Sequence, residues 1–247
     1  MKPTGRQFMA MTRYDELSPS DQSMGLSAPP LEKPVPHGVV PIILPEIDQI
    51  AVPDFSLRDG IRERRSIRHY QRSPLSVEEL AYLLWATQGI NAVQAPYYTL
   101  RTVPSAGGRH AFETYLCINQ VDGIPPGIYR YLPFSHALIP VDLSPGTSDQ
   151  TMKACLGQAF ARSAALVFLW SCVIYRMAWR YSERAYRLVH LDAGHVCQNL
   201  YLAGEQIGCG VCAIAAFDDQ LAADLLKIDG EEEFVIYCAT VGKKEDG

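Results

Sequence analysis

The stretch ERAYRLVHLDAGHVCQNLYLAGEQI (183–207) decides the fold class, because it predicts one long helix that leads directly into an apolar strand. Apolar side chains recur along it with helical spacing, which favours one buried face. They are Leu188, Leu191, Val196, Leu200 and Leu202. The segments that follow predict a strand and turn, CGVCAIAAF (209–217), a short helix, DDQLAADLLKI, capped by Asp218, and a final strand, EEFVIYCATVGK (232–243).

Helix and strand signals also alternate through the earlier part of the chain. Ser56 is a predicted N-cap for SLRDGIRERR. Ser76 and Glu79 predict a capping box for a helix that ends near Gly89. The other predicted elements are a strand at 112–121, a hairpin of GIYRYLP (127–133) and HALIPVDL (136–143), a helix at 149–161 and a buried strand at 164–175. This mixed order predicts an α+β layer fold with one sheet.

Residues 18–54 are rich in proline. Proline removes a backbone donor and fixes φ, so we expect an extended arm rather than a packed element. Apolar clusters such as VVPIILPEI indicate that the arm lies against the body or a partner subunit, with free disorder as the alternative. The predicted organisation is an arm at 1–55 and one folded domain at 56–247.

Composition limits the classes of function. The chain has 247 residues, of which 48% are hydrophobic, so it can form a substantial core. Its net charge of −5 disfavours nucleic-acid binding, which needs an extended basic surface. Neither a signal peptide nor an apolar run long enough to span a bilayer is visible, so we expect no membrane partner.

Seven cysteines lie mostly in apolar surroundings, which indicates buried, reduced thiols and a cytoplasmic protein. Cys209 and Cys212 form one CxxC pair. Because the pair lies in a predicted apolar strand without a second ligand pair, it indicates a strand of the core rather than a metal or redox site.

Positive charge is concentrated in RRSIRHY (64–70), although the chain as a whole is acidic. Arginine presents a planar fork of donors that matches phosphate oxygens, and a serine hydroxyl adds a further donor. Ser66 and Arg68 lie two apart, as on one face of an extended segment. The stretch alone fits an anion site and a solvated surface patch equally well.

Two turns of small residues are further candidates for ligand contacts. In RTVPSAGGRHAFE (101–113), Gly107 and Gly108 allow close approach of backbone N–H groups to a ligand, and Arg109 adds a fixed cation. In VCAIAAFDD (211–219), residues 213–216 offer main-chain donors with little side-chain bulk, which suits a flat ring. An ordinary loop and simple tight packing are the respective alternatives.

The long helix also carries His190, Asp192 and His195. The two histidines are five residues apart and do not share a helix face as a metal-binding pair would. We therefore expect no metal site and interpret the histidines as part of the core.

Together these segments resemble the nitroreductase family of FMN-dependent oxidoreductases, and more narrowly its SagB-type dehydrogenase-like branch. The resemblance covers residues 56–243 and rests on the order and spacing of RRSIRHY, LAYLLWATQG, VPSAGGRHAFETY, PPGIYRY, ERAYRLVHLDAGHVCQNLYLAGEQIG, CAIAAFDD and VGK. It implies a nitroreductase-like fold with a central, mostly antiparallel sheet flanked by helices. It also implies a domain-swapped homodimer with FMN at the subunit interface.

The resemblance further implies a role for individual residues. The FMN phosphate and ribityl chain would contact Arg64, Arg65, Ser66 and Arg68, with Lys243 nearby. The isoalloxazine would be lined, from the other subunit, by Pro104, Ser105, Ala106 and Gly107, with Arg109 close to it. Backbone amides of Ala215 and Ala216 would approach N5 and O4 of the flavin beside Ala213, and Gln158 would touch the ribityl chain or the ring edge.

The implied activity is ping-pong hydride or electron transfer through FMN, with NAD(P)H reducing the flavin and a nitro, quinone or other small acceptor reoxidising it. Azoline dehydrogenases of the SagB type use an adjacent Lys-Tyr pair as acid/base groups, whereas the matching pair here is Arg180 and Tyr181. Tyr181 remains a candidate acid/base, but arginine stays charged and carries protons poorly. Oxidation of azoline rings in a peptide and non-catalytic flavin binding are the alternative functions.

Overall fold

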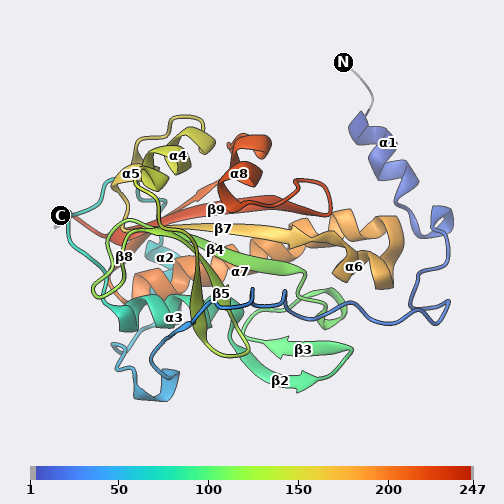
Figure 1. Cartoon of the computed structure of the whole chain (residues 1–247), viewed down its shortest axis with the longest axis horizontal. Coiled ribbons are helices and arrows are strands. Elements are labelled where there is room, and N and C mark those ends of the chain that lie inside the picture. Colours follow the sequence, from blue (N-terminus) through green and yellow to red (C-terminus); the bar gives the residue numbers. More distant parts are fainter. Residues whose placement is uncertain (1–3, 246–247) are drawn as a thin grey trace.

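A seven-stranded antiparallel sheet forms the centre of the protein in the computed structural model, which describes residues 4–245 (Figure 1). Its strand order is β1-β6-β5-β4-β7-β9-β8, and β2 and β3 form a separate hairpin. The strands are β1 (Ile42–Ile43), β2 (Ile90–Gln94), β3 (Tyr98–Arg101), β4 (Phe112–Ile118), β5 (Gly127–Leu132), β6 (Ala137–Asp142), β7 (Leu166–Val173), β8 (Cys209–Ile214) and β9 (Glu233–Lys243).

Helices cover both faces of the sheet (Figure 1). Side chains of α3, α6 and α7 belong to the larger apolar cluster on one face, and those of α4, α5 and α8 to a second cluster on the other. None of the helices within residues 4–245 is long and apolar enough to cross a bilayer. The helices are α1 (Thr4–Met11), α2 (Leu57–Glu63), α3 (Val77–Gln88), α4 (Thr147–Ala154), α5 (Phe160–Ser163), α6 (Ile174–Tyr181), α7 (Ala185–Gln206) and α8 (Asp219–Leu226), with short 3-10 turns η1 (Tyr14–Glu16), η2 (Ile47–Gln49), η3 (Ala106–Gly108) and η4 (Ser182–Arg184).

Local capping signals were reliable guides to the helix ends. Ser56 accepts from the amide of Asp59 at the start of α2, and the capping box that precedes α3 is complete. Gly89 is the C-cap of α3, where an added Cβ would lie 2.4 Å from the Trp85 ring. Asp218 caps α8. The CxxC pair lies buried in β8, as predicted for a core strand.

Three predictions need correction. The helix expected at 149–161 is two helices, because Leu156 and Gly157 have positive φ values of 53° and 76° and interrupt it. The strand expected at 164–175 ends at Val173, where α6 begins. The interpretation of His190 and His195 as core residues is wrong, since both side chains are exposed on α7.

The proline-rich arm lies against the body of the protein, which agrees with the expected extended conformation. It passes α6, crosses the end of the central strands and contributes the two-residue strand β1 to the edge of the sheet (Figure 1). Ile42 and Ile43 pair with Leu138 and Ala137 of β6. Part of the arm is therefore continuous with the main sheet.

Candidate functional site

The cationic stretch (residues 64–68) follows α2 and lies beside β8. Ser66 forms an isolated parallel bridge with Val211 of that strand. The side chains of Arg65, Ser66 and Arg68 are exposed, and that of Arg64 is half-buried. Within residues 4–245, none of these three arginines forms an ion pair with a carboxylate. The stretch therefore presents positive charge that the described chain does not neutralise.

Tyr201 of α7 joins the cationic stretch to the end of β8. Its hydroxyl lies 2.9 Å from Ser66 Oγ and accepts a hydrogen bond of 2.9 Å from the amide of Ala213. The guanidinium of Arg64 lies over the Tyr201 ring, 5.1 Å from its centroid. Sequence reasoning missed Tyr201, because a tyrosine within an apolar helical stretch carries no motif of its own.

The alanine turn (residues 213–217) continues from β8 toward α8. Ala215 and Ala216 are exposed, and in the described part of the chain their amides donate to no protein acceptor. Gln158 donates to the carbonyl of Ala216 at 2.9 Å, so it contacts this turn from the α4–α5 connection rather than from within a helix. The amides of Ala215 and Ala216 are therefore two main-chain donors without an acceptor in the described part of the chain.

Lys243 lies at the end of β9, which pairs with β8, the strand that leads into the alanine turn. Its ammonium forms an ion pair with Glu79 of α3, and its carbonyl accepts from the amide of Gln71. The backbone contact places Lys243 near the end of the RRSIRHY segment, but Glu79 neutralises its charge. A contact between Lys243 and a phosphate stays a prediction.

In the glycine loop (residues 104–109), polar groups form hydrogen bonds within the protein, unlike the unpaired donors of the alanine turn. The hydroxyl of Ser105 donates to Asp192 of α7 at 2.6 Å, and the amide of Ala106 donates to the same carboxylate at 3.2 Å. Ser105 Oγ also accepts from the amide of His110 at 2.9 Å. Burial raises the pKa of Asp192 above its ordinary value, while these two donors act in the opposite direction. The loop is thus fixed to α7 by a buried network.

Tyr181 and Arg180, at the end of α6, pack against this loop. Gly107 has a φ of 59°, and a Cβ added there would lie 2.6 Å from Tyr181 Oη and 3.0 Å from the Arg180 side chain. Only glycine tolerates both this conformation and this approach. The candidate acid/base and the candidate ring-binding loop therefore meet in the structure.

Arg109 lies behind the loop and is only 1% exposed. Its Nε donates to the carbonyl of Arg176 at 2.7 Å, its Nη1 donates to the carbonyl of Tyr97, and its guanidinium stacks 4.7 Å from the Trp179 ring centroid. Nη2 is buried without a partner. Burial, reinforced by Arg180 and Arg176, lowers the pKa of Arg109 to about 10. The side chain is a buried cation without a carboxylate partner in the described chain.

Helix α7 holds the two halves of the candidate site on opposite sides. Asp192 binds the glycine loop and Tyr201 binds the cationic stretch and the alanine turn. Nine residues separate them, which corresponds to roughly 13 Å of rise and half a turn in rotation. The two halves thus lie on opposite faces of one helix within a single chain.

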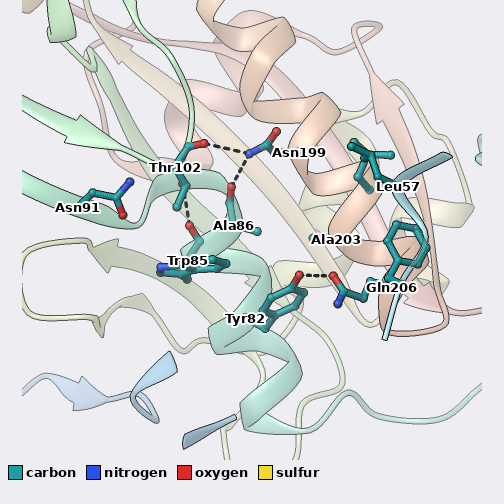
Figure 2. Close-up of a pocket in the computed structure, with 11 residues that line it drawn as sticks. Leu57, Tyr82, Trp85, Ala86, Asn91, Thr102, Asn199, Ala203 and Gln206 are labelled. Atoms are coloured by element: carbon teal, nitrogen blue, oxygen red, sulfur yellow. Dashed lines mark hydrogen bonds between the residues drawn. The ribbon is translucent and has the colours of Figure 1, made fainter. Parts of the chain in front are cut away.

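A cavity of about 390 Å³ lies between α2, α3 and α7 (Figure 2). Tyr82 and Trp85 form a stacked wall with centroids 5.9 Å apart. The Asn199 amide donates to the carbonyls of Ala86 and Thr102, which ties α7 to α3 and to the segment leading into the glycine loop. Neutral side chains line this cavity, and none of the predicted flavin-binding residues does so.

Known proteins with similar sequences identify the family. The model of the nitroreductase family matches residues 61–243. The chain belongs to the nitroreductase family. A candidate nitroreductase of Methanocaldococcus jannaschii is 33% identical over 203 residues, covering 82% of this chain and 96% of that protein.

This nitroreductase-family chain is also similar to the microcin B17-processing protein McbC of Escherichia coli, at 28% identity over 169 residues. That match covers 62% of this chain and 56% of McbC, so the chain spans about half the length of that relative. A solved structure of a candidate nitroreductase from Ralstonia eutropha JMP134 superimposes with a TM-score of 0.69 at 25% identity, covering 90% of this chain and all of the other.

The nitroreductase-like fold, with its central antiparallel sheet flanked by helices, is thereby confirmed. A further family structure, from Desulfovibrio desulfuricans and solved in complex with FMN, shares the fold with a TM-score of 0.54 at 17% identity, covering 78% of this chain and 92% of that one. Family and fold together make the protein an oxidoreductase of the nitroreductase family.

Proposed function

We propose that the protein binds FMN and transfers hydride or electrons in two half-reactions, from NAD(P)H to a nitro, quinone or other small acceptor. The observation that carries this proposal is the contact of Tyr201 with both Ser66 and Ala213, which brings unneutralised arginines beside unpaired backbone amides. Arginines suit a phosphate, and exposed amides suit the polar edge of a flat ring. When bound, FMN supplies the redox chemistry.

In this proposal Arg64, Arg65, Ser66 and Arg68 hold the phosphate and the ribityl chain. The amides of Ala215 and Ala216 donate to the ring edge, and Gln158 fixes their turn through the Ala216 carbonyl. Because these donors already lack protein partners, binding of a polar edge there does not break an existing hydrogen bond.

The glycine loop would act on the ring bound by the other subunit of a homodimer. The half-turn between Asp192 and Tyr201 on α7 supports this arrangement, because the two halves face away from each other within one chain. Large apolar side chains are exposed on α2 and α7, namely Leu57, Ile61 and Leu191, and a second subunit would bury such surface. The buried charge of Arg109 would then lie behind a ring that becomes anionic on reduction, and stabilise it.

Tyr181 is our candidate acid/base, since its hydroxyl lies against the loop that would line the ring. A phenol can donate or accept a proton, whereas Arg180 keeps its charge. The seven buried free thiols fit a reducing cytoplasm, where we place the protein.

A direct test is to purify the protein, record its visible spectrum and identify any released flavin. We expect bound FMN, bleached by NAD(P)H and restored by a nitro or quinone acceptor. Replacing Arg64 and Ser66 together by alanine should weaken the binding of FMN more than that of riboflavin, which has the ribityl chain but lacks the phosphate. A protein that takes up no added FMN would overturn the proposal.

The similarity to McbC favours a second candidate function, oxidation of an azoline ring in a peptide to the azole. In that reaction the ring would lose a hydride to the oxidised flavin and a proton to a base, and Tyr181 as the phenolate would be that base. Incubation of the FMN-loaded protein with an azoline peptide, followed by mass spectrometry, tests this. Loss of a hydrogen pair in the wild type but not in Tyr181→Phe would support it, and an unchanged peptide mass would exclude the peptides tried.

A further inference from the structure

The proline-rich segment at residues 21–36 is here called the strap. Three hydrogen bonds join backbone groups of the strap to α6. Trp179 Nε1 donates to the carbonyl of Leu26 at 3.0 Å, and the amide of Gln22 donates to the carbonyl of Trp179 at 2.8 Å. Arg176 Nε donates to the carbonyl of Pro30 at 2.9 Å. Both Arg176 and Trp179 are only 2% exposed. These contacts stay in place whatever side chains the strap carries, because they use its backbone.

Beyond α6 the strap is fixed to the central strands by buried charges. The amide of Lys33 donates to Glu113 of β4 at 3.0 Å, and its ammonium pairs with Glu233. Arg130 of β5 donates to the carbonyl of Pro34 at 2.8 Å. Glu113 also binds Arg176 at 2.6 Å, so one carboxylate connects the strap, β4 and α6. Separating such buried partners would leave charges unpaired, which is costly.

The same two residues of α6 also contact Arg109 of the glycine loop. Arg109 Nε binds the carbonyl of Arg176, and its guanidinium lies on the Trp179 ring. The next two residues, Arg180 and Tyr181, pack against Gly107. Residues 176–181 of α6 therefore contact both the strap and the glycine loop.

We propose that the strap is a positioning element of the candidate active site: by fixing Arg176 and Trp179 it sets the positions of Tyr181 and Arg109 against the glycine loop. Trp179 and Arg176 are positioning residues in this proposal, and Tyr181 is the group they position. The part that concerns catalysis rests on the proposed FMN-dependent function, whereas the mechanical coupling from strap to loop does not.

The test loosens the strap in two ways: Trp179→Phe keeps only a smaller aromatic ring beside Arg109, whereas Tyr175→Phe leaves the ring on which Arg109 lies unchanged. Trp179→Phe loses the hydrogen bond to Leu26, and Tyr175→Phe loses the 2.7 Å bond from Tyr175 Oη to Asp21 of the strap. The control is Tyr129→Phe, which loses a tyrosine hydrogen bond of 2.7 Å to the carbonyl of Pro125, a residue outside the strap. The double variant Tyr175→Phe/Trp179→Phe is compared with this control well below its melting temperature.

Amide hydrogen exchange of the loop is the readout that needs no flavin. The amides of Ala106, Gly108, Arg109 and His110 are all hydrogen-bonded. We expect their exchange to rise in the strap variants by about fivefold for each bond lost, and to stay unchanged in the control. Unchanged loop exchange in a folded double variant would overturn the proposal and leave the strap as a stabilising element only.

Turnover separates this inference from the proposed function. If the protein uses FMN, the double variant should show a lower kcat with wild-type flavin content and KM. If the wild type binds no FMN, the proposed function fails, but faster loop exchange in the variants would still establish the coupling. A double variant with wild-type kcat and faster exchange would show that the strap does not position catalytic groups.

Discussion

The cationic stretch and the glycine loop contain similar donors but use them in opposite ways. In residues 64–68 the arginines have no carboxylate partners in the described chain, Arg65 and Arg68 are exposed, and one hydroxyl meets Tyr201. In residues 104–109 the serine and the arginine turn inward, to Asp192 and to the carbonyl of Arg176. In our proposal the first region contacts a ligand, whereas the second region is held by contacts within the protein. Substitutions in the two regions should therefore have different consequences.

The largest loss of stability is expected when Asp192, which binds the glycine loop, is replaced. Asp192→Ala would leave Ser105 Oγ and the amide of Ala106 without their buried acceptor, so we expect a loss of about 2–4 kcal/mol of unfolding free energy. Urea unfolding measures this loss. Asp218→Ala, which removes the capping carboxylate of α8, is a comparison with an expected cost of about 1 kcal/mol. Equal losses for both variants would contradict a special role of the Asp192 network.

His110, which directly follows the glycine loop, should make the stability of the protein depend on pH. Burial, and then the charge of Arg101, lowers the pKa of His110 to about 3, against about 6.5 in the unfolded chain. Between these values the unfolded state binds a proton that the folded state does not, so stability falls as the pH falls. The slope is at most about 1.4 kcal/mol per pH unit. Urea unfolding from pH 7 to pH 4.5 should show this slope in the wild type and a smaller one in His110→Gln.

Gly107→Ala tests the contact between the loop and Tyr181. Alanine at a φ of 59° costs about 1–2 kcal/mol, and the close approach to Tyr181 Oη adds to it. Gly123→Ala is a matched control, because its φ is 76° and nothing lies within 4 Å of an added Cβ. We expect Gly107→Ala to lower the melting temperature more than Gly123→Ala. The excess should shrink when Tyr181→Phe is added.

The smallest effect on stability is expected in the cationic stretch. Arg68→Ala removes an exposed side chain, so the unfolding free energy should change by less than about 0.5 kcal/mol. Its FMN affinity should fall by roughly tenfold, since a charge-assisted contact is lost, and its affinity for riboflavin, which lacks the phosphate, should fall by less. Arg72→Ala, an exposed arginine outside the stretch, is the control. A similar loss of FMN affinity in both variants would point to general charge rather than to a defined phosphate contact.

Elements with strong local signals were predictable from the sequence. The α7 helix, the β5–β6 hairpin, β8 and the caps at Ser56, Ser76 and Asp218 follow from periodicity and side-chain capping. The break at Leu156 and Gly157 was missed because residues on both sides favour a helix and only the backbone shows the positive φ. The hairpin of β2 and β3 and helices α1 and α6 also went unrecognised.

The candidate site residues were proposed as a set, whose role in binding stays a prediction, and their individual contacts could not be predicted. The cationic stretch, the alanine turn and the glycine loop were identified from residue types and order. The contacts of Tyr201 with Ser66 and of Asp192 with Ser105 join residues more than eighty positions apart in the sequence, so no local pattern reveals these two contacts. Arg109 illustrates the same limit, since its burial beneath the loop depends on Trp179 of α6.

Strand β1 carries a consequence for how the protein behaves at high concentration. It forms one edge of the main sheet and contains only Ile42 and Ile43, between Pro41 and Pro45. An exposed sheet edge normally offers a row of unpaired backbone groups on which another chain can add a strand. Proline has no backbone N–H group, so the two prolines leave no amide donor at their positions on either side of this short strand. The arm therefore protects this edge against strand addition and the aggregation that follows from it.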